Sequence, residues 1–290
     1  MEENTRPMEG NMINLVVDSG CDISKDVIEH DNCNLSHIPL NLQLGDDVYL
    51  DDETLNIEDY LVHMEKSPIG VKTSAPSPDL FLEHFKRDGN VFVVTLSSRL
   101  SATYQSAVTA KDMYMEEYGK KFIHVFDSLS ASVGQGVIAM KISELIKKGT
   151  HSMEDVVEQV NQYMTGMRTY FILDKYDNLV KTGRISPYIA KIASFLNVKP
   201  ICGDHDGEIK MEDKARGYTK AVTKLVEIIK NNTQDIEDRV VAISHCKCYE
   251  KAVALKDEVL KQLQVKDVVI QECRGVVATY ANRGGVVLAL

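Results

Sequence analysis

The sequence has no tryptophan, no excess of basic residues and no apolar run long enough to cross a membrane. Its 33 Lys and Arg against 43 Asp and Glu give a formal net charge of −10. This balance argues against nucleic acid or an anionic membrane surface as a general partner, because both attract positive charge. No stretch approaches the roughly 20 apolar residues of a membrane span. We therefore expect no integral membrane contact.

Cysteine is sparse and follows no framework. The six cysteines are scattered through 290 residues, a length that folds without disulfide support. Residues 1–11 are polar and acidic, which predicts a disordered tail and no secretory leader. Free thiols and a cytoplasmic location are the expectation. A metal site at His245, Cys246 and Cys248 is disfavoured because zinc sites usually contain Cys-x-x-Cys or a similar spacing.

Two catalytic signatures are also missing. The chain has no Gly-rich loop ending in Lys-Ser/Thr, so nothing predicts a nucleotide phosphate cradle. It has no Gly-x-Ser-x-Gly elbow, although its eight histidines would supply bases for a serine hydrolase. A hydrolase or phosphotransfer enzyme, acting on a small carboxylated or phosphorylated substrate, is kept as the alternative to a binding protein.

Hydrophobic periodicity predicts an α/β protein of two domains. Buried strands at 12–17, 91–96 and 121–126 alternate with helices, which favours a Rossmann-like, largely parallel sheet with helices on both faces. Residues 38–44 are predicted as one strand, near a sheet edge because of Pro39. The pattern after 169 indicates a mixed α+β domain. The predicted division is a tail at 1–11, domains at 12–165 and 166–290, and a ligand site between the domains. Residues 66–85 are assigned to the first domain but could pack against the second.

The most informative stretch is 91–107, which reads as strand, hydroxyl-rich turn and helix. The first amides of a helix lack internal partners and attract anions. Hydroxyls at Ser97, Ser98, Ser101 and Thr103 would add donors. The alternative is that these hydroxyls only cap helices and form turns, as Ser and Thr often do.

Six motifs in order make the chain similar to the DegV family, over nearly all residues after the tail. They are Asp18-Ser19, Thr73-Ser74-Ala75-Pro76-Ser77-Pro78, Leu96-Ser97-Ser98-Arg99-Leu100-Ser101-Ala102-Thr103-Tyr104-Gln105-Ser106-Ala107, Asp127-Ser128 with Gly134-Gln135-Gly136, Gly183-Arg184-Ile185 and Lys199-Pro200-Ile201. The resemblance implies a two-domain protein that binds one long-chain fatty acid, with the acyl chain in an apolar tunnel. It also implies that a separate fatty-acid kinase subunit, which holds the ATP, phosphorylates the carboxyl group.

The resemblance assigns the site residues. Thr73 and Ser98 would bind the carboxylate directly, and Ser97, Ser101 and Arg184 would assist. Tyr280 is also expected to bind the ligand. It stands where kinase-linked members tend to have histidine, and Arg283 stands where proline is usual. Ala102 and Thr182 replace two family glycines. These departures bear more on the kinase partner than on fatty-acid binding.

The expectation is thus a cytoplasmic, non-enzymatic, lipid-binding protein with no catalytic residue, metal or cofactor and with a bound fatty acid as ligand. Besides the enzyme, the alternative is a regulatory module that senses a lipid. Chain-length preference and oligomeric state do not follow from the sequence.

Overall fold

The computed structural model describes residues 12–290, so the predicted tail at 1–11 lies outside the described residues. The first sheet is fully parallel, in the order β2-β1-β6-β7. Its strands are β1 (Ile13–Asp18), β2 (Cys33–Ile38), β6 (Asn90–Thr95) and β7 (Ile123–Asp127). Its helices are α1 (Lys25–Ile28), α3 (Pro78–Phe85), α4 (Thr103–Tyr118), α5 (Val133–Lys148) and α6 (Met153–Thr165).

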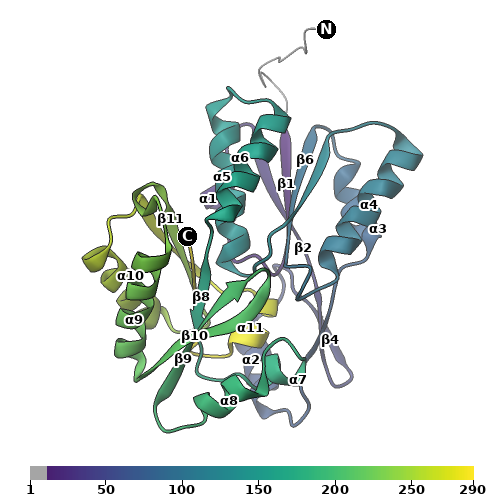
Figure 1. The fold of residues 1–290 in the computed structure, drawn as a ribbon. Coiled ribbons are helices and arrows are strands. Elements are labelled where there is room, and N and C mark those ends of the chain that lie inside the picture. The colour runs from purple at the N-terminus through teal and green to yellow at the C-terminus, as the bar shows by residue number, and fades with distance from the viewer. Residues whose placement is uncertain (1–11) are drawn as a thin grey trace.

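Alternation along the strands places helices on both faces of this sheet. In β1, Leu15 packs in one core with α5 and α6, whereas Val16 packs in another with α3 and α4. Successive side chains of a strand point to opposite faces, which produces this division. Figure 1 shows the same arrangement, with α3 and α4 on one side and α5 and α6 on the other. The predicted Rossmann-like architecture is confirmed.

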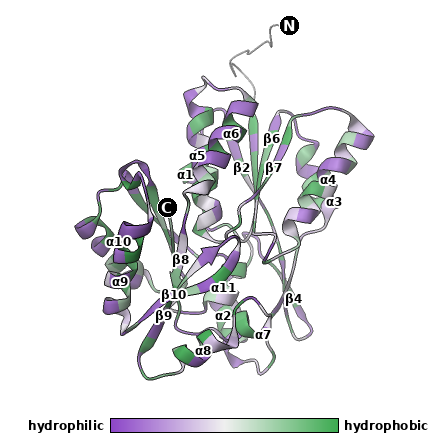
Figure 2. Ribbon diagram, in the orientation of Figure 1, coloured by the Kyte–Doolittle hydropathy of each residue, from purple (hydrophilic) through white to green (hydrophobic). Residues whose placement is uncertain are grey.

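The second sheet is mixed, in the order β10-β9-β8-β13-β11-β12. Its strands are β8 (Thr169–Ile172), β9 (Val198–His205), β10 (Glu208–Arg216), β11 (Val240–His245), β12 (Asp267–Glu272) and β13 (Val286–Ala289). Its remaining helical elements are α9 (Tyr218–Asn232), η1 (Ile236–Asp238) and α10 (Tyr249–Gln262). In Figure 2, α9 and α10 carry both hydrophobic and hydrophilic colours, as expected of helices that cover a sheet.

Helix α5 joins the two sheets. It contacts β1 and β6 of the first sheet and β11 and β13 of the second, and Ala242 and Val287 belong to the same core as Leu15. The predicted domain boundary after residue 165 coincides with the end of α6 and stays a prediction.

A small antiparallel sheet, β4-β3-β5, was not predicted. Its strands are β3 (Asn41–Leu44), β4 (Asp47–Leu50) and β5 (Lys72–Ser74). The prediction of one strand over 38–44 is wrong, because the chain leaves the parallel sheet at Ile38 and enters β3 at Asn41. Pro39 has no N–H for a ladder, and the Leu40 N–H donates to Ser19 Oγ at 3.0 Å.

Four further helices pack together with β3 in one hydrophobic core. They are α2 (Ile57–Lys66), α7 (Asp177–Lys181), α8 (Pro187–Ala193) and α11 (Gly275–Ala281). Helix α11 contacts α2 and α7, and all four share one hydrophobic core with β3. This core borders the cavity described next.

Candidate functional site

A cavity of about 120 Å³ lies between the elements of the two predicted domains. A single buried water needs roughly 10–15 Å³ by the same measure, so the cavity accepts a larger ligand. Most of its wall is apolar. The apolar lining consists of Leu40, Leu96, Leu100, Leu129, Ala131, Phe171, Leu173, Leu179, Ile209, Val276, Val277, Ala281 and Val287.

Four of the predicted site residues meet at one part of this wall: Thr73, Ser101, Arg184 and Tyr280. Thr73 comes from β5, and its Oγ1 lies 2.7 Å from the hydroxyl of Tyr280 in α11. Ser101 precedes α4, and its Oγ lies 2.8 Å from Thr103 Oγ1. The structure thus brings together hydroxyls from segments more than 200 residues apart in sequence.

Arg184 brings the positive charge. Its Nη1 donates to Thr182 O at 3.0 Å and its Nε to Leu100 O at 3.4 Å. Its guanidinium carbon lies 5.7 Å from the centre of the Tyr280 ring. Among residues 12–290, no acidic side chain forms an ion pair with Arg184. A half-buried cation on an apolar cavity, held only by carbonyls, is suited to an anionic ligand.

Ser97 and Ser98 differ from the expectation, since neither lines the cavity. Ser97 is fully buried, and its Oγ donates to Gly207 O at 2.9 Å in the turn between β9 and β10. Ser98 is exposed, and its N–H donates to Asp127 Oδ1 at 3.0 Å. The hydroxyl of Ser97 is therefore occupied, and that of Ser98 lies outside the lining. Of these serines, Ser101 is the one that lines the cavity together with Thr73 and Arg184.

Two buried aspartates, Asp18 and Asp22, hold the loops around the cavity and were not among the predicted site residues. Asp18 ends β1, and its Oδ2 accepts from the Leu96 N–H at 2.6 Å. Asp22 Oδ2 accepts from Ser132 Oγ at 2.6 Å, and its Oδ1 from the Arg274 N–H at 2.7 Å. Both therefore position neighbours of the cavity wall. Their place directly after the first buried strand was the available signal.

Burial is the main influence on these carboxyl groups. It raises the pKa of Asp18 to about 6 and that of Asp22 to about 7, although hydrogen bonds from Leu96 and Ser132 act in the opposite direction. Burial also raises the pKa of Asp51, whose two oxygens accept from the Gly275 and Val276 N–H groups at 2.7 Å. These contacts fix the start of α11, the helix that carries Tyr280.

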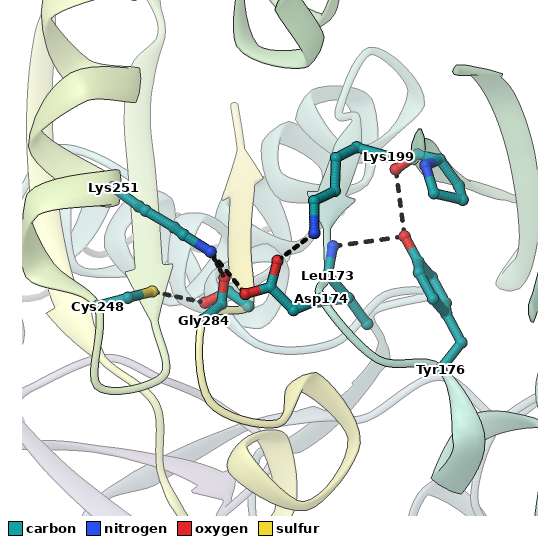
Figure 3. Close-up of polar contacts among 9 residues, drawn as sticks. Leu173, Asp174, Tyr176, Lys199, Cys248, Lys251 and Gly284 are labelled. Atoms are coloured by element: carbon teal, nitrogen blue, oxygen red, sulfur yellow. Dashed lines mark hydrogen bonds and ion pairs between the residues drawn. The ribbon is translucent and has the colours of Figure 1, made fainter. Parts of the chain in front are cut away.

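An ion-pair cluster fixes the loop after β8 (Figure 3). Asp174 accepts from Lys199 Nζ at 2.6 Å and from Lys251 Nζ at 2.7 Å. Burial acts to raise the pKa of Asp174, but the two lysines outweigh it and the pKa is lowered. Lys251 Nζ also donates to Gly284 O at 3.0 Å. The cluster therefore ties the loop after Leu173 to the loop between α11 and β13.

The motif Lys199-Pro200-Ile201 receives a structural explanation from the same region. The Tyr176 hydroxyl donates to Pro200 O at 3.1 Å and accepts from the Leu173 N–H at 3.4 Å. Lys199 pairs with Asp174, and Ile201 is fully buried. The motif is thus a support for the segment between β8 and Arg184.

No histidine from 12–290 lines the cavity. Within that range no group of three or more His, Cys, Asp and Glu side chains could hold a metal ion. The six cysteines are all buried and unpaired. Over the same residues, no helix combines the length and the apolar character that a membrane span requires.

Comparison with known proteins gives a consistent picture. Residues 12–290 match the sequence model of a family described as uncharacterised protein, DegV family. A DegV domain-containing protein of Streptococcus pyogenes serotype M1 is 34% identical over 277 residues, which are 94% of this chain and 97% of the relative.

Two solved structures share the fold. A DegV family protein from Ruminococcus gnavus, described with vaccenic acid, has a TM-score of 0.90 and 36% identity, covering 96% of this chain and 99% of the other. The Streptococcus pneumoniae Fatty Acid Kinase (Fak) B3 protein, described as loaded with linoleic acid, has a TM-score of 0.89 and 30% identity, covering 96% and 98%.

Proposed function

Because this chain belongs to the DegV family, we propose that it binds one long-chain fatty acid in the cavity between its two larger sheets. The carboxylate lies against Arg184, Thr73, Ser101 and Tyr280, and the acyl chain lies along the apolar wall. The observation that carries this proposal is the guanidinium of Arg184, which has no ion-pair partner among residues 12–290 and lines the same mostly apolar cavity as the three hydroxyls.

The energetics suit such a ligand. Each methylene taken from water contributes about 0.8 kcal/mol, so an acyl chain drives binding with few polar contacts. A buried carboxylate is costly unless charged or hydroxyl donors satisfy it. Arg184 supplies the charge, and Thr73 and Tyr280 supply hydroxyls that already point at one another across 2.7 Å.

We further propose a binding protein rather than an enzyme. The absence of histidine from the lining within 12–290 disfavours a serine hydrolase. Similarity to the Fak B3 protein supports presentation of the acid to a separate kinase subunit. Because Tyr280 lies at the carboxylate end, binding to a kinase subunit requires an experiment separate from the test of fatty-acid binding. A cytoplasmic location is supported by six buried, unpaired cysteines.

Denaturing mass spectrometry of the purified protein tests the proposal. We expect a co-purified fatty acid at close to one molecule per chain. Absence of lipid after gentle purification, together with no rise in melting temperature on adding oleate, would contradict it. Ester or phosphate turnover by the chain alone, lost on Thr73→Val, would favour an enzyme.

A further inference from the structure

Arg184 and Tyr280 meet at the cavity although they come from different elements. The Arg184 guanidinium carbon lies 5.7 Å from the Tyr280 ring centre, but Arg184 follows α7 whereas Tyr280 belongs to α11. Among residues 12–290, no hydrogen bond joins the two side chains. Those of Arg184 go to Thr182 O and Leu100 O, and the Tyr280 hydroxyl pairs with Thr73 Oγ1. Another contact must therefore hold α7 against α11.

Asn178 makes that contact. It lies in α7, is 8% exposed and is not part of the cavity lining. Its Nδ2 donates to Thr279 O at 2.8 Å. Because the carbonyls of a last helical turn have no partner within the helix, the Asn178 amide satisfies one at the end of α11, directly before Tyr280. Thr279 is also held from α2, since the Tyr60 hydroxyl lies 2.6 Å from Thr279 Oγ1.

The backbone of Asn178 continues the connection towards Arg184. Asn178 O accepts from the Thr182 hydroxyl at 2.6 Å and from the Thr182 N–H at 3.2 Å. Thr182 O in turn accepts from Arg184 Nη1 at 3.0 Å. Thr182 stands in place of a family glycine, and a glycine would lack the hydroxyl that makes the shorter of the two bonds. A continuous series of contacts thus runs from α11 through Asn178 and Thr182 to the guanidinium.

We propose that Asn178 and Thr182 are positioning residues that set the place of Arg184 relative to Tyr280, and thereby determine the preference of the site for a carboxylate over an uncharged head group. This inference rests on the proposed fatty-acid-binding function. The reason is geometric, because a hydrogen bond between charged groups depends on its distance and angle. A displaced guanidinium loses its bond to the carboxylate, whereas the apolar wall still binds the acyl chain.

The test measures the ratio of the affinities for oleic acid and oleyl alcohol, by calorimetry on delipidated protein. Asn178→Leu removes the donor to Thr279 O and keeps a side chain of similar size. Asn14→Leu is the matched control. Asn14 is 7% exposed, lies outside the cavity lining, and its Nδ2 also donates to a backbone carbonyl, that of Asp88 at 2.7 Å.

A second pair of variants keeps the test open if Asn178→Leu fails to fold. Thr182→Val deletes the hydroxyl and retains the shape of the side chain. Thr165→Val is its control, because the Thr165 hydroxyl also donates to a carbonyl of the preceding helical turn, Gln162 O at 2.8 Å, outside the cavity lining. Each pair therefore removes the same kind of hydrogen bond at the site and away from it.

We expect Asn178→Leu to weaken oleic acid about tenfold, the equivalent of one hydrogen bond to a charged partner, and to change the alcohol less than about twofold. Thr182→Val should weaken the acid about threefold, because one of two bonds to Asn178 O remains. Both controls should leave the ratio unchanged, although Asn14→Leu should lower the melting temperature. In the Arg184→Gln background, Asn178→Leu should have no further effect on the acid, because the group that it positions is absent.

Two results would overturn the inference. One is an unchanged ratio of acid to alcohol affinity in Asn178→Leu and Thr182→Val, which would assign both residues a structural role only. The other is a full further loss of acid affinity when Asn178→Leu is added to Arg184→Gln, which would show that Asn178 does not act through Arg184. Failure of the proposed function itself would look different, because then the wild-type protein would bind no fatty acid.

Discussion

The hydroxyl of Tyr280 lies 2.7 Å from Oγ1 of Thr73 and so joins α11 to β5 in the wall of the candidate site. Neither residue belongs to the strand-turn-helix segment at 91–107. The pair places two hydroxyl groups beside the Arg184 guanidinium, which lies 5.7 Å from the Tyr280 ring centre. This arrangement makes separable predictions for the two residues.

Removing the Thr73 hydroxyl should weaken fatty-acid binding more than removing that of Tyr280. Thr73→Val keeps the shape and deletes one donor to the carboxylate, an expected loss of about 1 kcal/mol. Tyr280→Phe keeps the ring beneath Arg184 and releases Thr73 to bond the ligand. Titration calorimetry with oleate measures both. A larger loss for Tyr280→Phe than for Thr73→Val would reverse the assignment of these roles.

Substituting the adjacent residues Ser97 and Ser98 by alanine should change the free energy of unfolding by different amounts. Ser97→Ala deletes the bond to Gly207 O inside a fully buried site, which we expect to cost about 1–3 kcal/mol of unfolding free energy. Ser98→Ala alters an exposed side chain and should stay within about 0.5 kcal/mol. Urea unfolding distinguishes them. Oleate titration of the Ser98→Ala variant also tests whether Ser98 touches the ligand, since an unchanged affinity excludes a direct contact.

The raised pKa of Asp22 should make the stability of the protein depend on pH. Burial raises its pKa to about 7, whereas an unfolded Asp titrates near 3.9. The folded state thus holds a proton that the unfolded state has lost, so this contribution to stability declines as pH rises from about 4 to about 7. Asp22→Asn, which mimics the protonated form, should abolish that part of the decline, a difference of a few kcal/mol at about 1.4 kcal/mol per pKa unit.

Urea unfolding at several pH values compares the two proteins directly. The expected result is that the Asp22→Asn variant gains stability relative to the wild type as pH rises through this window. Parallel pH profiles would show that Asp22 is ionised in the folded protein throughout. The other buried aspartates, Asp18 and Asp51, are present in both proteins and cancel in the difference.

Gly284 tests the ion-pair cluster. Its φ of +86° disfavours any side chain, and a Cβ there would also collide with the Asp174 carboxylate. Gly119 has a φ of +87° with no neighbour within 4 Å, which makes it the matched control. Gly284→Ala should therefore lower the unfolding free energy by more than Gly119→Ala does. Equal losses would mean that the Asp174 cluster adapts without cost.

Local sequence patterns predicted the larger sheets and part of the site. The parallel strands and their helices were readable because buried runs and helical periodicity are local signals. The division of 38–44 between two sheets could not be predicted in this way, because it depends on a hydrogen bond from the Leu40 N–H to Ser19 Oγ in another loop. Ser101 and Arg184 line one cavity, and only the family resemblance linked them in advance. The role of Ser97 depends on the β9–β10 turn reaching the first domain, a long-range contact that no local pattern encodes.

The most direct test of the account compares an acid with the alcohol of equal chain length. Calorimetric titration of wild-type protein and Arg184→Gln with oleic acid and oleyl alcohol isolates the interaction of the guanidinium with the carboxylate. We predict that Arg184→Gln weakens the acid at least tenfold and leaves the alcohol nearly unchanged, because hydrogen bonds between charged groups contribute about 1.5–3 kcal/mol. An equal loss for acid and alcohol would show that Arg184 does not sense the charge and would contradict the proposed site.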